Sequence, residues 1–317
     1  MLERASRALL LVSLLLLGGC GGRPTVEPTP PSPSETFPLT VTDDEKRQVA
    51  IPAPPRRIVS LAAAHTETLF ALGAGERVVA ADSYSDYPPE AKHLARLRCF
   101  PRVPLEELVA LRPDLVLILT QEDEEISQME AAGLRVLKIF PETLDAAWDR
   151  ILLLGRITER EQRAQEIVDD IRRRVTRVER SLQGVTPRTV MFELDASDPA
   201  RPYVAGSGGF YGQLIPHAGG RNVFEDLRGP SGQVSAEQVI ARSPEVILLG
   251  DTRSPVLPQS PELVRQRPGW GRISAVREGR VFGIDSDRIT RPGPRLIEGL
   301  EEIARRLHPE RFREAAR

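Results

Sequence analysis

The stretch VPLEELVALRPDLVLI at residues 103–118 decides the fold, because VSAEQVIARSPEVILL at 234–249 repeats it at a constant offset of 131 residues. Positions that are identical in the two copies include Glu106 with Glu237, Ala110 with Ala241 and Pro113 with Pro244. Each copy has the pattern of an amphipathic helix, a turn fixed by proline and a fully apolar strand. The recurrence of a helix and a buried strand in both halves predicts two α/β lobes of similar topology.

Short apolar runs and helical patterns alternate on both sides of the repeat. In the first half we expect strands at 39–41, 48–51, 58–61, 77–81, 115–119 and 135–140, and helices at 66–72, 90–96 and 105–111. In the second half the alternation continues through 189–194, 210–217, 235–241, 246–249, 280–284 and 294–307. Continuous apolar strands bounded by helices predict mainly parallel sheets that are covered on both faces.

A segment without proline separates the two halves. Residues 143–182 hold apolar positions at helical spacing, which predicts a shorter helix, a turn near 155–158 and a long helix over 159–182. The predicted fold class is therefore α/β. Two Rossmann-like lobes at 37–142 and 185–317 are joined by connecting helices at 143–184, with a cleft between the lobes.

The composition excludes several classes of protein. The chain holds 43 Lys and Arg against 45 Asp and Glu, a formal net charge of −2, so it offers no basic footprint for nucleic acid. Two cysteines, Cys20 and Cys99, exclude a disulfide framework and a cysteine-rich metal site. The four histidines are scattered, and the glycine-rich run at 206–212 lacks the lysine of a phosphate-binding loop. We expect no metal and no cofactor, and a binding protein rather than an enzyme; a tethered extracytoplasmic hydrolase is the alternative.

The N-terminus has the pattern of an export signal. Two arginines precede an apolar run at 8–17, which is too short to span a bilayer as a helix. The following Leu-Gly-Gly-Cys at 17–20 resembles the bacterial lipobox, so we expect a signal peptide at 1–19 and lipidation of Cys20. A proline-rich tether at 20–36 then leads to the folded body. This pattern predicts a protein that is extracytoplasmic and anchored to the cell membrane; an ordinary signal peptide with a chance cysteine is the alternative.

Four stretches resemble one family of transport proteins. They are RIVSLAAAHTETLFALG at 57–73, SYSDYPPEA at 83–91, LEELVALRPDLVL at 105–117 and VSAEQVIARSPEVILL at 234–249. These stretches are similar to the ABC-transporter periplasmic binding proteins for cobalamin, iron–siderophores and haem, and SYSDYPPEA most resembles the cobalamin binders. The resemblance implies a monomeric binding protein with a rigid two-lobe fold, whose long helix limits hinge motion. It further implies that a cobalamin-type corrinoid is delivered to an ABC permease dimer with its ATPase subunits; haem or a ferric siderophore is the alternative ligand.

The resemblance also assigns ligand-binding residues. Tyr84 matches a tyrosine that packs on the corrinoid, and Phe100 falls where the cobalamin binders have a tryptophan. Leu119 and Ser231 fall at positions of further tryptophans, so part of that aromatic wall is replaced in this chain. The other lip of the cleft is assigned to the aromatic side chains of Tyr203, Phe210 and Tyr211; core packing remains the alternative for at least one of them.

Charged residues complete the assignment. Arg291 is placed near the cleft, where it either meets an acidic group of the ligand or forms a surface ion pair. Glu106 and Glu237 match the paired glutamates with which the family docks onto arginines of the permease. One carboxylate on each of two similar lobes suits a two-fold symmetric partner. The alternative role for both glutamates is stabilisation of the helix dipole from the first turn.

Overall fold

The computed structural model describes residues 37–119, 122–254 and 256–312. The predicted signal peptide, Cys20 and the predicted tether lie outside the described residues. Residues Glu35–Arg317 form one compact unit, and all three hydrophobic clusters of the described chain lie within it. This body therefore has a complete core of its own and is expected to fold independently of the N-terminal segment.

The first lobe is built on a five-stranded parallel sheet with the strand order β5-β4-β3-β6-β7. An antiparallel hairpin of β1 (Leu39–Thr42) and β2 (Gln48–Ile51) precedes it. The strands are β3 (Ile58–Ser60), β4 (Val78–Asp82), β5 (Ala95–Leu97), β6 (Leu115–Ile118) and β7 (Val136–Lys138). The helices are α1 (Ala63–Ala71), α2 (Leu105–Ala110) and α3 (Asp123–Ala131). Strand β6, which lies between β3 and β7, is buried at every position, as its continuous apolar run predicts.

The second lobe contains a mixed sheet with the order β11-β9-β8-β12-β13, and β10 pairs with β8 on the same side as β9. Its strands are β8 (Arg188–Asp195), β9 (Tyr203–Ala205), β10 (Gly220–Asn222), β11 (Ser231–Gln233), β12 (Val246–Leu249) and β13 (Val281–Gly283). Its helices are α6 (Gly209–His217), α7 (Ala236–Arg242), α8 (Pro261–Gln266), α9 (Ser274–Arg277), α10 (Ser286–Thr290) and α11 (Leu296–Leu307). The pairings of β8, β10, β12 and β13 are parallel and those of β9 and β11 are antiparallel, so the predicted α/β class with mainly parallel sheets is confirmed.

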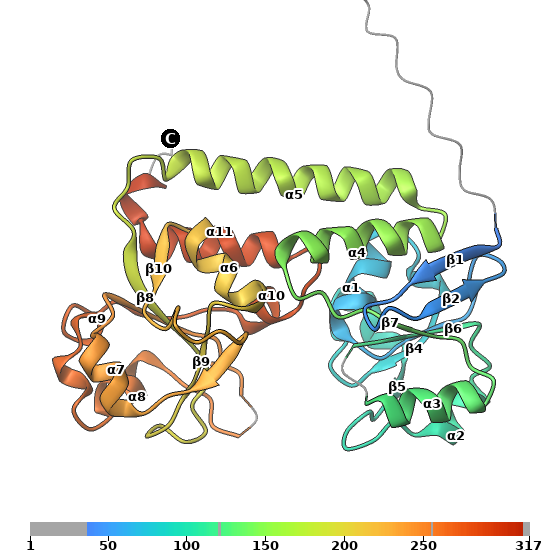
Figure 1. The fold of residues 1–317 in the computed structure, drawn as a ribbon, viewed down its shortest axis with the longest axis horizontal. Helices are drawn as coiled ribbons and strands as arrows, with labels where there is room; N and C mark the ends of the chain where they lie inside the picture. The colour runs from blue at the N-terminus through green and yellow to red at the C-terminus, as the bar shows by residue number, and fades with distance from the viewer. Residues whose placement is uncertain (1–36, 120–121, 255, 313–317) are drawn as a thin grey trace, which may run out of the picture. The chain divides into compact units, whose positions relative to one another are not determined.

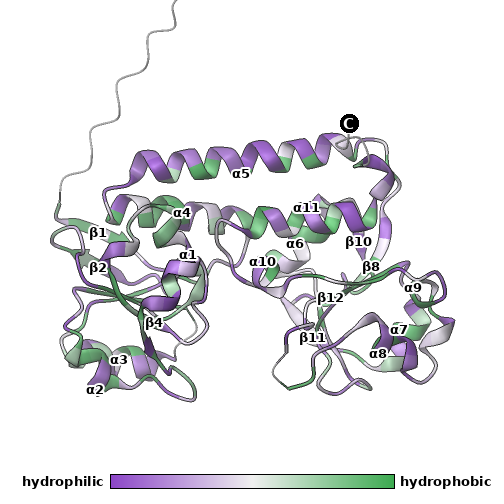
Figure 2. Ribbon diagram, turned by 180° about the vertical axis from the view of Figure 1, so that it is seen from behind, coloured by the Kyte–Doolittle hydropathy of each residue, from purple (hydrophilic) through white to green (hydrophobic). Residues whose placement is uncertain are grey.

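Two helices connect the lobes. They are α4 (Leu144–Ile157) and α5 (Glu161–Ser181), and α5 lies along the back of both lobes with α11 beneath it (Figure 1). Figure 2 colours α5 mainly as hydrophilic, because only its inner stripe is apolar. The predicted long helix is confirmed, but the turn before it comes later than predicted, since α4 continues to Ile157. Gly155 allows the last turn of α4 to pack closely on α5, because a Cβ atom at this position would lie 2.3 Å from the Cβ of Ala164.

The internal repeat is visible in the backbone. Strands β6 and β12 start and end at positions separated by the offset of the repeat, and each lies inside its sheet. Arg112 and Ser243, which are equivalent in the repeat, both adopt a positive φ, of 46° and 40°. Proline follows each of them and disfavours a helical conformation at the preceding residue, so each helix ends there.

The repeat also places one carboxylate directly before β6 and one directly before β12. Asp114 precedes β6 and accepts a hydrogen bond from the backbone N–H of Arg57 at 3.0 Å. Glu245 precedes β12 and accepts one from the backbone N–H of Thr189 at 2.7 Å. These hydrogen bonds tie β6 to β3 in the first lobe and β12 to β8 in the second, at equivalent positions of the repeat.

One predicted helix is wrong. Residues 90–96 form a single 3-10 turn at Pro89–His93 followed by β5, which the sequence analysis missed. The sequence of β5 is Ala-Arg-Leu, too short and too polar for a strand signal, and it becomes a strand because the edge of β4 is open to it. The first lobe consequently has five strands in its sheet rather than four.

Candidate functional site

Three adjoining pockets form a cleft at the carboxyl ends of the sheet strands. One pocket lies on the first lobe, one lies against the second, and the third shares residues with both of them. The shared residues are Leu61, Asp82 and Tyr84 on one side and Leu119, Thr290 and Pro292 on the other. The volumes of the three pockets, about 430, 450 and 340 Å³, fall in the range of small-molecule sites.

Tyr84 and Phe100 form the aromatic part of the wall on the first lobe. Tyr84 is 68% exposed and Phe100 is 85% exposed, so both rings are open to solvent beside one pocket. The loop that carries Tyr84 is held from below by Ser85, whose fully buried hydroxyl donates to Asp82 and shares a hydrogen bond of 2.8 Å with Thr66. The loop is therefore fixed while the tyrosine ring stays exposed.

The wall on the second lobe depends on close approach of two loops. The N–H groups of Gly206 and Gly208 donate to the backbone carbonyls of Pro230 and Gly229 at 3.0 and 3.1 Å. A Cβ atom at either glycine would lie within 2.7 Å of a carbonyl oxygen of this facing loop. The glycine-rich run thus packs on its neighbour and brings Ser231 to the cleft.

Aromatic side chains continue along this wall. Phe210 and Tyr211, at the start of α6, pack with ring centroids 4.2 Å apart, and both line the same pocket as Ser231. Phe210 is at the same time largely buried in the core, so it joins the core to the cleft. Phe140 follows β7, is 43% exposed and completes this pocket; the sequence analysis missed it.

Arg291 lies at the floor of the cleft within an ion-pair cluster that joins the lobes. Its guanidinium donates to Glu67 of α1 and to Asp86, both at 2.9 Å. Arg295 donates to both oxygens of Glu67, at 2.8 and 2.6 Å, and stacks on the ring of Tyr87. Glu67 is buried, and its carboxylate is paired with two arginines from the other half of the chain. Arg291 does form ion pairs, although they are largely buried and not on the surface as predicted; its contact with a ligand stays a prediction.

Titration in the cleft follows from burial and this cluster. Burial raises the pKa of Asp82, while its hydrogen bond with Ser85 acts in the opposite direction. Burial also acts to raise the pKa of Asp86, but the hydrogen bond and charge of Arg291 outweigh it, so the pKa is lowered. Burial raises the pKa of Cys99, which lines the cleft, to about 12, so this thiol stays protonated at neutral pH.

The cleft contains no grouped metal ligands in the described part of the chain. No three His, Cys, Asp or Glu side chains gather around a common point among residues 37–119, 122–254 and 256–312. His65 lies beneath the cleft, where burial lowers its pKa to about 4. Its Nε2 lies 3.0 Å from the carbonyl oxygen of Ile139, so this ring nitrogen already has a hydrogen-bond partner.

Most of the predicted ligand-binding residues lie together. Tyr84, Phe100, Leu119, Phe210, Ser231 and Arg291 all line the three adjoining pockets. Tyr203 does not: it lies on β9, is 46% exposed and lines none of the pockets. Tyr211, which was assigned to the same lip, does line the cleft, as does Phe140, which was not predicted.

The two predicted docking glutamates occupy equivalent, exposed positions. Glu106 is in the first turn of α2 and Glu237 in the first turn of α7, one on each lobe. Ser235 and Gln238 form a capping box around the start of α7. A backbone hydrogen bond and one from Ser235 lower the pKa of Glu237, so it is ionised at neutral pH. Each lobe therefore presents an exposed carboxyl group at the start of an equivalent helix.

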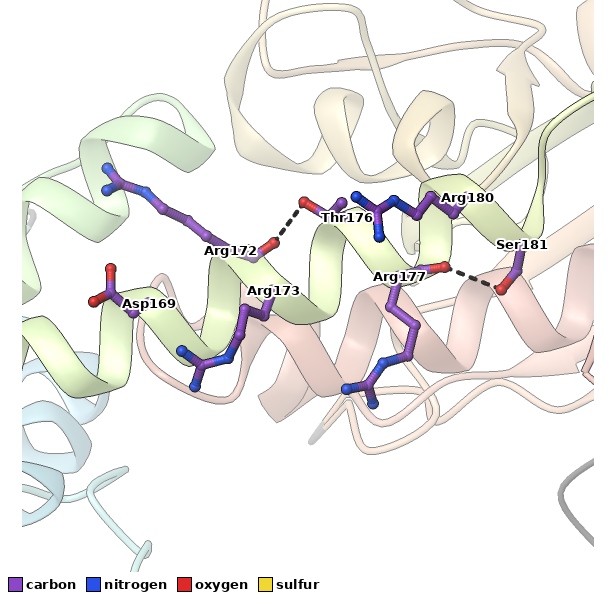
Figure 3. A pocket seen from close by; sticks show the side chains of 7 residues that line it. All are labelled: Asp169, Arg172, Arg173, Thr176, Arg177, Arg180 and Ser181. Carbon is purple, nitrogen blue, oxygen red and sulfur yellow. Dashed lines mark hydrogen bonds between the residues drawn. The ribbon is translucent and has the colours of Figure 1, made fainter. Parts of the chain in front are cut away.

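A further groove of the described surface lies outside the cleft. It runs along the outer face of α5, between arginine side chains, and contains no residue of the cleft (Figure 3). No helix of the described residues is both long and apolar enough to cross a bilayer.

Two α/β lobes joined by helices, with an aromatic cleft between them, are the architecture of a solute-binding protein. Residues 58–288 match the family model described as periplasmic binding protein, and the chain belongs to this family. Proteins of this family bind solutes and are not enzymes, which favours the binding interpretation over a hydrolase.

Known proteins agree with this assignment. The uncharacterised ABC transporter substrate-binding lipoprotein YvrC of Bacillus subtilis is 29% identical over 97% of this chain and 98% of its own. The vitamin B12-binding protein BtuF of Vibrio cholerae superposes with a TM-score of 0.70 at 26% identity, over 83% of this chain and 100% of its own. The haem-binding protein RhuT of a Roseiflexus species superposes with a TM-score of 0.72 at 27% identity, over 81% and 99%. The chain is a substrate-binding protein of an ABC importer.

Replacement of Glu67 by alanine is expected to weaken the body severely. The substitution removes the carboxylate that pairs with Arg295 and leaves the Arg291–Asp86 pair as the remainder of the cluster, so we expect a loss of about 3–5 kcal/mol in the free energy of unfolding. Urea unfolding measures it. The matched control is Glu166→Ala, which removes an exposed pair with Arg163 and is expected to cost less than about 1 kcal/mol. Equal small losses in both variants would show that the cluster does not stabilise the body.

Proposed function

We propose that this protein is a lipid-anchored, extracytoplasmic binding protein that captures a cobalamin-type corrinoid and delivers it to an ABC permease. It performs no chemistry on the ligand. The observation that carries the proposal is the pair of exposed rings, Tyr84 and Phe100, on one wall of a cleft of small-molecule size. Two exposed rings that line one pocket form an apolar surface of the kind that marks ligand sites, and flat aromatic faces suit a macrocycle.

The second lobe supplies a complementary surface. Phe210, Tyr211 and Pro292 give this side an apolar lining, and Ser231 adds a hydroxyl. Arg228 also lines this pocket and is exposed, so a cation is available to an acidic substituent of the ligand. An apolar cleft with a few polar groups at its edge is typical of sites for small organic ligands.

Haem or a ferric siderophore is the second candidate ligand. Leu119 and Ser231 stand at positions where the resemblance places tryptophans, so the cleft has smaller side chains there than the cobalamin binders. The likeness to the haem-binding protein of Roseiflexus, at 27% identity, matches the likeness to the B12-binding protein of Vibrio, at 26%. Haem and cobalamin both contain a flat macrocycle, and a direct titration separates these two ligands.

The ligand is tested by calorimetric titration of the body, residues 35–317, with cyanocobalamin, haemin and a hydroxamate siderophore. We expect saturable binding of cyanocobalamin. Phe100→Ala is expected to weaken it about 10- to 100-fold, because the buried area of one aromatic ring is lost. Tyr203→Ala, which removes an exposed ring outside the cleft, is the control and is expected to leave affinity unchanged. Binding of haemin or the siderophore alone would replace the corrinoid; binding of none of them would contradict the proposal.

Docking on the permease is proposed to use Glu106 and Glu237. The double variant Glu106→Ala/Glu237→Ala is expected to keep ligand affinity and to lose at least about 10-fold in uptake, since each lobe loses its charged contact. Uptake of labelled ligand by cells measures it. The control is Glu107→Ala/Glu262→Ala, which removes two other exposed first-turn glutamates and so reproduces any effect on helix dipoles. Equal loss in both double variants would assign the glutamates to helix stability.

The membrane anchor is proposed to be Cys20. Cys20→Ala is expected to abolish incorporation of labelled fatty acid and to release the protein from the membrane fraction at high salt, because no acyl chain remains to hold it and electrostatic contacts are screened. Cys99→Ala is the control, since it changes the chain's other cysteine. Fractionation of cells that express each variant provides the measurement. Acylation that persists in Cys20→Ala would refute the assignment.

A further inference from the structure

The charges of α5 are separated into two blocks. Its first ten residues, 161–170, hold four acidic residues and one arginine, whereas the following eleven, 171–181, hold five arginines and one glutamate. The protein as a whole carries a net charge of −2, so the second half of α5 is a local exception. This block is what requires an explanation.

Side chains, most of them from the second half, line the groove along the outer face of α5. The lining residues recur every three or four positions and therefore share one face of the helix: Asp169, Arg172, Arg173, Thr176, Arg177, Arg180 and Ser181. Thr176 and Ser181 donate their hydroxyl protons back to carbonyls of α5, at 2.9 and 3.0 Å (Figure 3). The small side chains thus turn toward the helix while the arginines extend from it.

Few of these arginines are neutralised. Arg174 pairs with Glu301 at 2.8 Å, and Arg173 pairs with Asp170 at 3.2 Å. Arg172, Arg177 and Arg180 are exposed and make no ion pair with any residue of the described chain. Three guanidinium groups are therefore available on one helix face.

Ordinary helix electrostatics does not account for this block. Cations are favoured near a helix C-terminus, but the effect is confined to the last turn. Arg172 lies nine residues before Ser181, which is about 13 Å along the axis. A solvated face would alternate the two signs of charge. The one glutamate of this half, Glu179, instead contacts His217 at 2.7 Å.

The chemistry of the surface indicates its partner. The exposed large hydrophobic residues of the described chain are Tyr84, Tyr87, Phe100, Val109, Phe140, Tyr203, Val256, Leu257 and Leu263, so none of them lies on α4, α5 or α11. Protein interfaces have an apolar centre, which is missing here. Arginine forks without apolar neighbours suit a surface of phosphate groups. We propose that Arg172, Arg177 and Arg180, the α5 arginine face, bind the anionic headgroups of a phospholipid bilayer.

This contact orients the body on the membrane. In Figure 1, α5 lies on the side of the body away from α2 and α7, which carry Glu106 and Glu237. A body that rests on α5 therefore holds these glutamates away from the lipid. The contact describes a waiting state from which the protein must turn to reach its permease, and it rests on neither the identity of the ligand nor acylation of Cys20.

Sedimentation with vesicles tests the proposal on the body, residues 35–317, which lacks the signal segment and any acyl chain. We expect binding to vesicles that contain phosphatidylglycerol and none to vesicles of phosphatidylcholine, with loss of binding at high salt. The triple variant R172Q/R177Q/R180Q is expected to bind about 100-fold more weakly, at about 1 kcal/mol for each arginine. Unchanged far-ultraviolet circular dichroism verifies that the variant is folded.

A matched variant separates the face from net charge. R265Q/R272Q/R277Q removes three exposed arginines from the region of α8 and α9 and changes the net charge by the same amount. It is expected to bind anionic vesicles like the unmodified body. Equal weakening in both triple variants, equal binding to neutral vesicles, or no binding to either vesicle would overturn the proposal.

Discussion

The buried carboxylate of Glu67 is the contact on which the cleft depends. It belongs to α1 of the first lobe, yet its partners Arg291 and Arg295 are separated from it by more than 220 positions in the chain. Arg295 is the residue at the start of α11, and the neighbouring Thr290 and Pro292 line the cleft. One charge therefore fixes the floor of the site and the entrance to the helix that packs beneath α5. Burial of this carboxylate is tolerable only because both of its oxygens are satisfied.

The connecting helices add a second constraint. Gly155 lets α4 and α5 approach more closely than any side chain would permit, and the inner stripe of α5 is buried along the helix. Because α5 packs on α4, α6 and α11, we expect it to oppose wide opening of the lobes. The shape of the cleft is consequently set by the side chains that line it rather than by closure. The size of Leu119 and Ser231, which line this cleft, therefore affects the space for a ligand directly.

Much of this architecture could be predicted because it rests on local patterns. The repeat placed β6 and β12 correctly, since four consecutive buried apolar residues leave few alternatives. It failed at β5, whose three residues become a strand only because β4 offers an open edge. The same limit applies in the site. Phe140, at the end of the strand predicted over 135–140, carried a signal that could have been used, whereas the pairing of Glu67 with Arg291 across the whole chain has no local signature. Tyr203 lies outside the cleft as part of the antiparallel strand β9, which was also not predicted.

The two sides of the body have opposite chemistry. The exposed large hydrophobic side chains of the described residues, among them Tyr84, Phe100 and Phe140 of the cleft, all lie outside α4, α5 and α11, so the back of the body exposes charge without large apolar groups. Apolar contacts and electrostatic contacts respond differently to salt. A protein that binds and releases partners repeatedly therefore gains from keeping the two kinds of contact on separate surfaces. A net charge of −2 conceals this division, since the acidic first half of α5 cancels most of the basic second half. The distribution of charge, rather than its sum, therefore carries the information about how this body meets its surroundings.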